Sequence, residues 1–254
     1  MTGPERIAAA FSGNGKRAAL MPYLMGGFPT IDASRDVLRA YADGGADLVE
    51  FGIPFSDPLA DGPVIHSAGV EALKNGATVS SVLDVAAEQA ERLPIVVMCY
   101  ANIVFAQGAD AFAAALAERG ICGLIVPDLP LEEAPTVLEA CDAAGIALVP
   151  LVAPTTPDDR MQAIGARARG FVYTVSSVGT TGERTGSDYA ELVSRTKAHT
   201  EVPVAVGFGI STPEQGAAAA EQGADGVIIG TRLVRAVAEG DDVAALIRSF
   251  AQAL

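Results

Sequence analysis

Residues 44–53 read Gly-Gly-Ala-Asp-Leu-Val-Glu-Phe-Gly-Ile, a glycine turn that leads into a short, almost continuously apolar run. Such a run is typical of a strand that is buried on both faces, as in a parallel sheet covered by helices. A glycine in the turn fits the left-handed residue that ends a helix before the next strand begins. The stretch therefore predicts one helix-to-strand unit of an α/β fold.

The same unit recurs along the chain, with similar glycine turns at 119–122, 144–147 and 222–225. We predict eight strands, at residues 19–25, 47–53, 95–100, 123–127, 147–152, 171–175, 203–208 and 226–230. Between them lie stretches with helical spacing, at residues 33–42, 79–92, 109–119, 131–143, 157–167, 189–198 and 213–221. Residues 3–12 and 241–253 are expected to form extra helices at the two ends. This alternation predicts an α/β fold, a (β/α)8 TIM barrel in one domain over 1–254, with a doubly wound open sheet as the alternative.

The composition limits the possible partners. Lys and Arg number 17 against 31 for Asp and Glu, which gives a net charge of −14, and no basic run occurs. Nucleic acid and anionic membranes are therefore poor partners. No apolar stretch approaches the roughly 18 residues that span a bilayer, and the first residues lack a signal-peptide pattern, so we expect a soluble cytoplasmic protein. Cys99, Cys122 and Cys141 are expected to be reduced, buried and small.

The strand ends are where a TIM barrel carries its chemistry. None of the three lysines, Lys16, Lys74 and Lys197, ends a predicted strand, which disfavours a Schiff-base or PLP-anchoring barrel. The two histidines, His66 and His199, lie at opposite ends of the barrel, so the nitrogen ligands of a metal-dependent aldolase are lacking. We therefore expect neither a metal nor a cofactor.

Carboxylates remain as the candidate catalytic groups. Glu50 lies within an apolar strand, where a charge is costly unless it is used or paired. The loop that follows adds Asp57 and Asp61, although each could simply be turn chemistry next to Pro or Gly. Asp128 ends a strand just before a helix, where an N-cap is the expected role.

Glycines at the ends of the last strands indicate a phosphate site. The loop over 176–186 carries three glycines and many hydroxyls, and Gly207, Gly209 and Gly230 end two strands. Backbone N–H groups and a helix N-terminus at this place form a phosphate cradle in many barrels, while the alternative is that these glycines only permit tight turns.

Residues 48–63 read Leu-Val-Glu-Phe-Gly-Ile-Pro-Phe-Ser-Asp-Pro-Leu-Ala-Asp-Gly-Pro. Shorter motifs are Tyr100-Ala101-Asn102, Pro127-Asp128-Leu129-Pro130, Gly179-Thr180-Thr181-Gly182, Gly207-Phe208-Gly209-Ile210-Ser211 and Gly230-Thr231. Through these motifs the chain resembles the tryptophan synthase alpha-subunit family over its whole length. It departs from residues common in that family at Ser177, Thr180 and Thr231.

The resemblance implies a lyase that cleaves indole-3-glycerol phosphate to indole and glyceraldehyde 3-phosphate by a retro-aldol reaction. By motif, Glu50 would be the principal acid/base and Asp61 its partner. The residues implied to bind substrate are Tyr23, Ile65, Tyr100, Ile125, Tyr173, Thr181, Gly182, Phe208, Gly209, Gly230 and Thr231. The chemistry agrees, because the cleavage needs a proton at indole C3, removal of the neighbouring hydroxyl proton and stabilisation of positive charge on the indole nitrogen.

The resemblance also implies a PLP-dependent tryptophan synthase beta subunit as partner, in an α2β2 heterotetramer. We expect the contact at the loop 54–61, through Pro54 and Asp57, so that docking would bias the geometry of Asp61. Two alternatives are a sugar-phosphate isomerase or epimerase barrel, and a non-catalytic barrel that only activates a PLP enzyme. Retention of both Glu50 and Asp61 argues against the second alternative.

Overall fold

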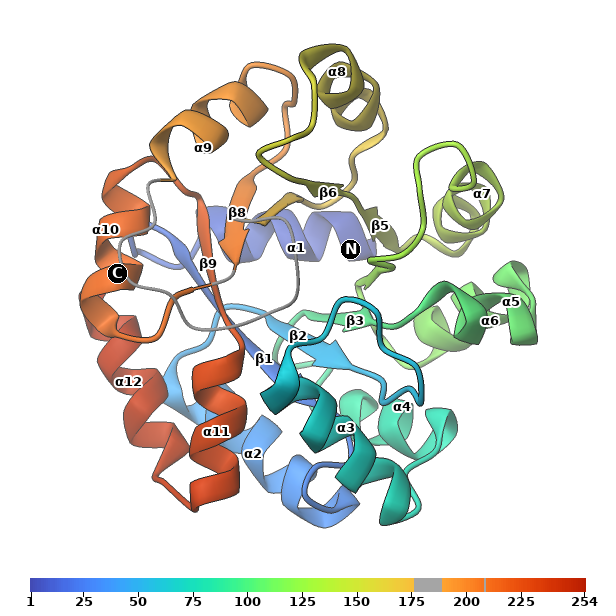
Figure 1. Cartoon of the computed structure of the whole chain (residues 1–254), viewed down its shortest axis with the longest axis vertical. Helices are drawn as coiled ribbons and strands as arrows, with labels where there is room; N and C mark the ends of the chain where they lie inside the picture. Colours follow the sequence, from blue (N-terminus) through green and yellow to red (C-terminus); the bar gives the residue numbers. More distant parts are fainter. Residues whose placement is uncertain (176–188, 208) are drawn as a thin grey trace.

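The computed structural model describes residues 1–175, 189–207 and 209–254, which form a ring of parallel strands surrounded by helices (Figure 1). The strands are β1 (Ala19–Met25), β2 (Val49–Gly52), β3 (Ile95–Met98), β4 (Gly123–Ile125), β5 (Ala147–Val149), β6 (Leu151–Val152), β7 (Val172–Val175), β8 (Val204–Gly207) and β9 (Gly226–Ile229). All of their pairings are parallel, in the order β5-β4-β3-β2-β1-β9-β8-β7-β6. The predicted TIM barrel is confirmed.

The barrel closes through a strand that is broken in two. We predicted one strand over 147–152, whereas the structure has β5 and β6 on either side of Pro150. Proline has no N–H to donate to a strand ladder, which interrupts the pairing at this residue. The Pro150 carbonyl still accepts a hydrogen bond from the N–H of Tyr173 (3.0 Å). The first and last strands of the sheet order are therefore consecutive in the chain.

The helices fill the connections between strands. They are α1 (Gly3–Ser12), α2 (Ile31–Gly44), α3 (Pro63–Lys74), α4 (Val79–Ala87), α5 (Ala101–Gln107), α6 (Ala109–Glu118), α7 (Pro135–Ala144), α8 (Asp158–Arg167), α9 (Ala190–Lys197), α10 (Pro213–Glu221), α11 (Thr231–Glu239) and α12 (Val243–Ala253). The two terminal helices are confirmed as α1 and α12. The helix expected from residue 131 begins only at Pro135, a residue that favours the first helical turn, and α5 was not predicted.

The glycine turns have the backbone that the sequence predicted. A positive φ angle is found in all four, at Gly45 (97°), Gly120 (71°), Gly145 (71°) and Gly223 (96°). Gly45 and Gly145 end α2 and α7 in the left-handed conformation, which other residues adopt only with strain. Each turn therefore stops one helix and directs the chain into the next strand.

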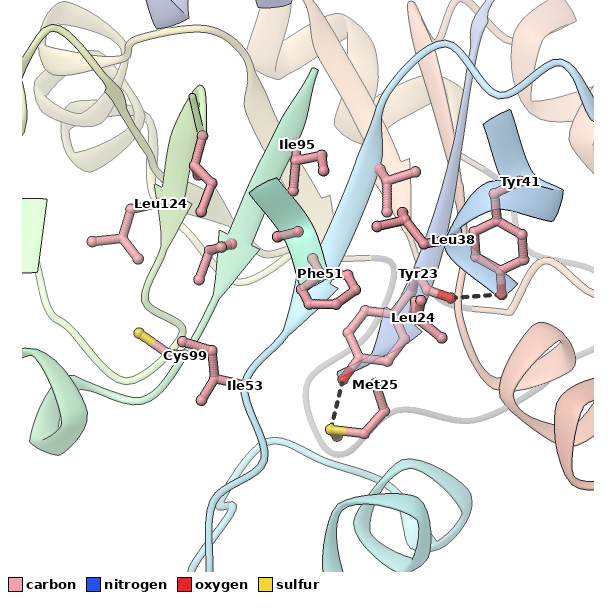
Figure 2. Packing of buried hydrophobic residues seen from close by; sticks show 14 of the residues in the cluster. Tyr23, Leu24, Met25, Leu38, Tyr41, Phe51, Ile53, Ile95, Cys99 and Leu124 are labelled. Atoms are coloured by element: carbon pink, nitrogen blue, oxygen red, sulfur yellow. Dashed lines mark hydrogen bonds between the residues drawn. The ribbon is translucent and has the colours of Figure 1, made fainter. Parts of the chain in front are cut away.

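Two apolar layers hold the barrel together. The inner layer includes Met21, Val96 and Phe171, and Ile7 of α1 completes it, because α1 lies across the barrel rather than in the outer ring (Figure 1). The outer layer lies between strands and helices, where the hydroxyl of buried Tyr41 donates to the Tyr23 carbonyl (3.1 Å; Figure 2). The three cysteines are buried and free, as expected.

Two aspartates at the amino-terminal end of the barrel follow the Gly-Ala turns and bind similar partners. Asp47 accepts hydrogen bonds from the backbone N–H of Leu20 (2.7 Å) and from Lys16 Nζ (2.8 Å). Asp225 accepts from the N–H of Val204 (2.8 Å) and from a lysine Nζ (2.7 Å). At this end of the barrel, each of these two Gly-Ala turns is therefore followed by an aspartate that forms an ion pair with a lysine.

Candidate active site

Glu50 is a buried carboxyl group on β2, with 2% of the residue exposed. Its Oε2 atom has no hydrogen-bond partner among the residues that the structure describes. Burial, and to a smaller extent the negative charge of Asp61, raises the pKa of the Glu50 carboxyl to about 8. Glu50 is therefore mostly protonated at neutral pH and can deliver a proton.

Two buried tyrosines lie near Glu50. Tyr23 is paired in register with Glu50 on the neighbouring strand β1, so the two side chains share a face of the sheet. Burial raises the pKa of the Tyr23 hydroxyl well above its ordinary value, and the charges of Asp61 and Glu50 add to this effect. The pKa of Tyr173 on β7 is raised by burial and by Glu50. Both hydroxyls therefore lie close to the Glu50 carboxyl, while their contact with substrate stays a prediction.

Asp61 reaches the same site from the loop between β2 and α3. Its carboxylate accepts a hydrogen bond from the hydroxyl of Tyr100 (3.0 Å), which in turn accepts one from the N–H of Ala60 (3.0 Å). Burial raises the pKa of Asp61, while the Tyr100 hydroxyl and the charge of His66 lower it. The structure thus brings both predicted carboxylates to the carboxyl ends of the strands.

Some of the other predicted binding residues lie in the part of the chain that the structure describes, and others do not. Ile65 and Ile125 are buried, on α3 and β4. A Cβ added at Gly230 would lie 3.8 Å from atoms of both Ile65 and Tyr23, which places the start of α11 against the site. Gly209 has a φ angle of 83°, and Thr231 is the first residue of α11. Thr181, Gly182 and Phe208 lie outside the described residues.

The remaining candidate residues have more specific surroundings than the sequence indicated. Asp128 does cap a helix, but not the one that follows it: its carboxylate accepts from the N–H of Ala101, the first residue of α5 (2.8 Å). Asp57 is exposed, whereas Pro54 is buried.

Phe55 was not predicted to be part of the site. Its ring stacks on Tyr100, with ring centres 5.3 Å apart and 26° between the ring planes. Phe55 is the one aromatic residue of the loop over 53–62, and that is the signal that could have revealed this contact. Phe55 thereby links the loop after β2 to the residue that holds Asp61.

Within the described ranges, no group of three or more His, Cys, Asp or Glu residues is placed to hold a metal ion. In the same ranges no helix is long and apolar enough to cross a membrane. A parallel barrel that carries a protonated glutamate and a second carboxylate at its strand ends has the site of a barrel enzyme that works by general acid–base catalysis.

Comparisons with known proteins narrow this class. The family model of the tryptophan synthase alpha chain matches residues 10–252. The alpha chain of Methanosarcina mazei is 46% identical over 241 residues, 94% of this chain and 88% of that protein. That of a Picosynechococcus species is 41% identical over 244 residues, 94% of this chain and 92% of that protein. The chain belongs to the tryptophan synthase alpha chain family.

Solved structures agree with this assignment. A tryptophan synthase chain from Mycobacterium tuberculosis superposes with a TM-score of 0.92, at 38% identity, over 98% of this chain and 97% of that one. A chain of the α2β2 tryptophan synthase complex from Pyrococcus furiosus superposes with a TM-score of 0.84, at 35% identity, over 91% and 97%. As a member of this family the chain is a lyase that cleaves indole-3-glycerol phosphate in tryptophan biosynthesis.

Proposed function

We propose that Glu50 is the general acid and base of the cleavage of indole-3-glycerol phosphate and that Asp61 stabilises the charge that develops. The observation that carries this proposal is the Glu50 carboxyl: buried, with a pKa of about 8 and an oxygen free of partners among the described residues. A structural glutamate at this depth would be expected to have its hydrogen bonds satisfied.

The reaction requires two proton movements. Protonated Glu50 gives its proton to C3 of the indole ring, which leaves positive charge on the ring nitrogen for ionised Asp61 to stabilise. The bond from C3 to the glycerol chain then breaks, and its electron pair restores the indole ring. As the carbonyl of glyceraldehyde 3-phosphate forms, the hydroxyl proton returns to Glu50, so that the enzyme ends in its initial protonation state.

The test is release of indole from indole-3-glycerol phosphate by the purified chain. Glu50→Gln keeps the shape of the side chain but removes the transferable proton, so we expect the rate to fall by about 10²–10⁴-fold with ligand affinity nearly intact. Asp61→Asn should leave a small residual activity, because its role is electrostatic. Equal and mild losses in the two variants would contradict these roles.

We also propose that the phosphate group binds at the ends of β8 and β9. The backbone N–H groups at the start of α11, beside Gly230 and Thr231, have the orientation and partial positive charge that anions favour. Gly209 permits close approach because it has no side chain. Backbone donors suit a protein of net charge −14, which has few cations to spare.

Replacing Gly209 with valine should weaken binding of glycerol phosphate severely, since a β-branched residue is strained at a φ angle of 83°. The matched control is Gly145→Val, which places the same residue at a φ angle of 71° at the other end of the barrel. Binding should be measured by calorimetry on folded protein. If Gly209→Val binds as well as the unchanged chain, the phosphate site lies elsewhere.

We further propose that the chain pairs with a PLP-dependent beta subunit in an α2β2 assembly. A related chain of Pyrococcus furiosus comes from such a complex. Beside the site, Leu59 is 79% exposed and Phe105 of α5 is 49% exposed, and Asp57 lies exposed on the same loop as Leu59. Leu59 and Phe105 lie on connections that follow β2 and β3, so both are at the carboxyl ends of the strands, and apolar side chains exposed there favour contact with a partner. Pro54 is buried in the chain by itself and stiffens the loop, and its place at the contact stays a prediction.

Titration of a cognate beta subunit into the indole-release assay tests the pairing. We expect the rate to rise, since a partner that docks on the loop of Asp61 biases the geometry of that residue. Asp57→Ala should weaken this activation more than it lowers the basal rate. An unchanged rate on addition of the beta subunit would contradict the coupling.

A further inference from the structure

The hydroxyl of Tyr100 lies between two neighbouring groups of the catalytic loop. It donates to Oδ1 of Asp61 and accepts from the N–H of Ala60, each at 3.0 Å. The hydroxyl therefore uses its donor function on Asp61 and its acceptor function on the preceding residue, Ala60. A side chain held at its carboxylate and at the preceding peptide has little freedom to rotate. Lining an apolar pocket would not require either hydrogen bond.

Tyr100 is itself held from three directions. The residue is buried, and its ring stacks on Phe55, which belongs to the same loop as Asp61. The next residue, Ala101, begins α5, and its N–H donates to the carboxylate of Asp128 at the end of β4 (2.8 Å). The position of Tyr100 is thus set by rigid elements of two neighbouring barrel units. A fixed donor of this kind can transmit that rigidity to the loop.

We propose that Tyr100 is a positioning residue, which holds Asp61 and the loop 54–61 in the arrangement that the reaction uses. This inference rests on the role proposed above for Asp61. It assigns to the tyrosine hydroxyl a task separate from contact between its ring and the indole. The tyrosine does not exchange protons with the substrate; it acts only through Asp61.

The charges around Asp61 indicate what loss of the hydroxyl does. Glu50 on β2, Tyr23 on β1 and His66 on α3 face Asp61 together with Tyr100. Burial raises the pKa of Asp61, and the Tyr100 hydroxyl is the larger of the two groups that lower it. Without this hydroxyl the pKa of Asp61 should rise, so that Asp61 becomes protonated at a higher pH than in the unchanged chain. The reaction needs the ionised form, so the acid side of the pH–rate profile should move upward.

The experiment is the Tyr100→Phe variant of the full chain, assayed by release of indole from pH 5 to 9. The ring and its stacking on Phe55 remain, so KM should stay close to that of the unchanged chain. We expect kcat to fall by about 10- to 100-fold, as for loss of a hydrogen bond to a charged group. The acid limb of kcat/KM should shift to higher pH. An unchanged acid limb would overturn the proposal.

Two further variants separate this proposal from its alternatives. Tyr41→Phe removes another buried tyrosine hydroxyl, one that donates to a backbone carbonyl and not to Asp61, and it should leave the pH profile unchanged. In an Asp61→Asn background, Tyr100→Phe should cost little more, because its effect passes through Asp61. Full additivity of the two losses would overturn the proposal. If Asp61→Asn alone keeps full activity, the role proposed for Asp61 is wrong, whatever Tyr100 does.

Discussion

The two ends of the barrel treat the same kind of side chain in opposite ways. At the amino-terminal end, the carboxylates of Asp47 and Asp225 each bind a backbone N–H and a lysine. At the carboxyl end, Glu50 has an oxygen without a partner among the described residues, and Asp61 accepts its hydrogen bond from a tyrosine hydroxyl and not from a lysine. Satisfied carboxylates stabilise a fold, whereas unsatisfied ones are available for chemistry.

This difference has an energetic consequence. A buried and unpaired carboxyl group resists ionisation, and the folded chain loses stability whenever the group must be charged. Glu50 therefore gives the site a proton donor at the expense of stability, as catalytic groups often do. Burial raises the pKa of Asp47 as well, although its hydrogen bonds to Lys16 and Leu20 oppose that effect. We expect stability, but not activity, to depend on the aspartates at the other end.

The largest expected effect is a gain of stability in Glu50→Gln at alkaline pH. Below about pH 4.5 Glu50 is protonated in the folded and the unfolded chain, so its ionisation contributes nothing. Between that pH and about 8 the unfolded chain ionises while the folded chain keeps the proton, which destabilises the fold by about 1.4 kcal/mol for each pH unit. The glutamine variant lacks this loss.

Urea unfolding at several pH values measures the effect. The free energy of unfolding of Glu50→Gln, relative to the unchanged chain, should rise between pH 5 and 8 by several kcal/mol. Any constant offset from the buried amide cancels in this comparison. A difference that stays flat with pH would mean that Glu50 has an ordinary pKa.

Asp47→Ala should have the next largest effect and the opposite sign. Side-chain exposures of 10% for Asp47 and 17% for Lys16 make this pair largely buried. Removing the carboxylate leaves the N–H of Leu20 without its acceptor and leaves Lys16 Nζ with the Gly45 carbonyl (2.8 Å) but no counter-charge, which should cost about 2–3 kcal/mol of folding free energy. Indole release by the folded variant should be unchanged at 25 °C. A loss of activity in a folded Asp47→Ala chain would contradict the assignment of stability to the amino-terminal end and of activity to the carboxyl end.

Asp225→Ala should have the smallest effect. Its ion pair has side-chain exposures of 36% for Asp225 and 40% for Lys197, so solvent screens the attraction. The lost hydrogen bond to Val204 leaves an expected cost of about 1 kcal/mol, again without loss of activity. A thermal unfolding series would show a smaller decrease of Tm than for Asp47→Ala; an equal or larger decrease would contradict the role of burial.

The barrel could be predicted from local patterns because its determinants are local. The run 44–53 carries a glycine turn, an apolar strand and a buried glutamate within ten residues, and each has a meaning without knowledge of the rest of the chain. The break of the fifth strand at Pro150 was missed because proline is apolar and does not interrupt the hydrophobic pattern, although it lacks the N–H that the strand ladder needs.

The candidate carboxylates were also found from sequence, but their surroundings were not. The pairing of Tyr100 with Asp61 joins residues 39 positions apart, and Asp128 caps a helix that begins 27 positions earlier in the chain. Such contacts depend on how neighbouring barrel units meet, which no local pattern encodes. For the same reason Asp128 was assigned to the wrong helix.

An NMR titration of the Glu50 carboxyl carbon, assigned by difference from Glu50→Gln, measures directly whether this group keeps its proton at neutral pH. We expect a midpoint near pH 8, because the group is buried and faces Asp61. Asp47→Ala should leave this midpoint unchanged, since the two carboxylates lie at opposite ends of the barrel. A midpoint near 4.5, the ordinary value for a glutamate, would contradict the claim that the carboxyl end of the barrel holds a proton ready for transfer.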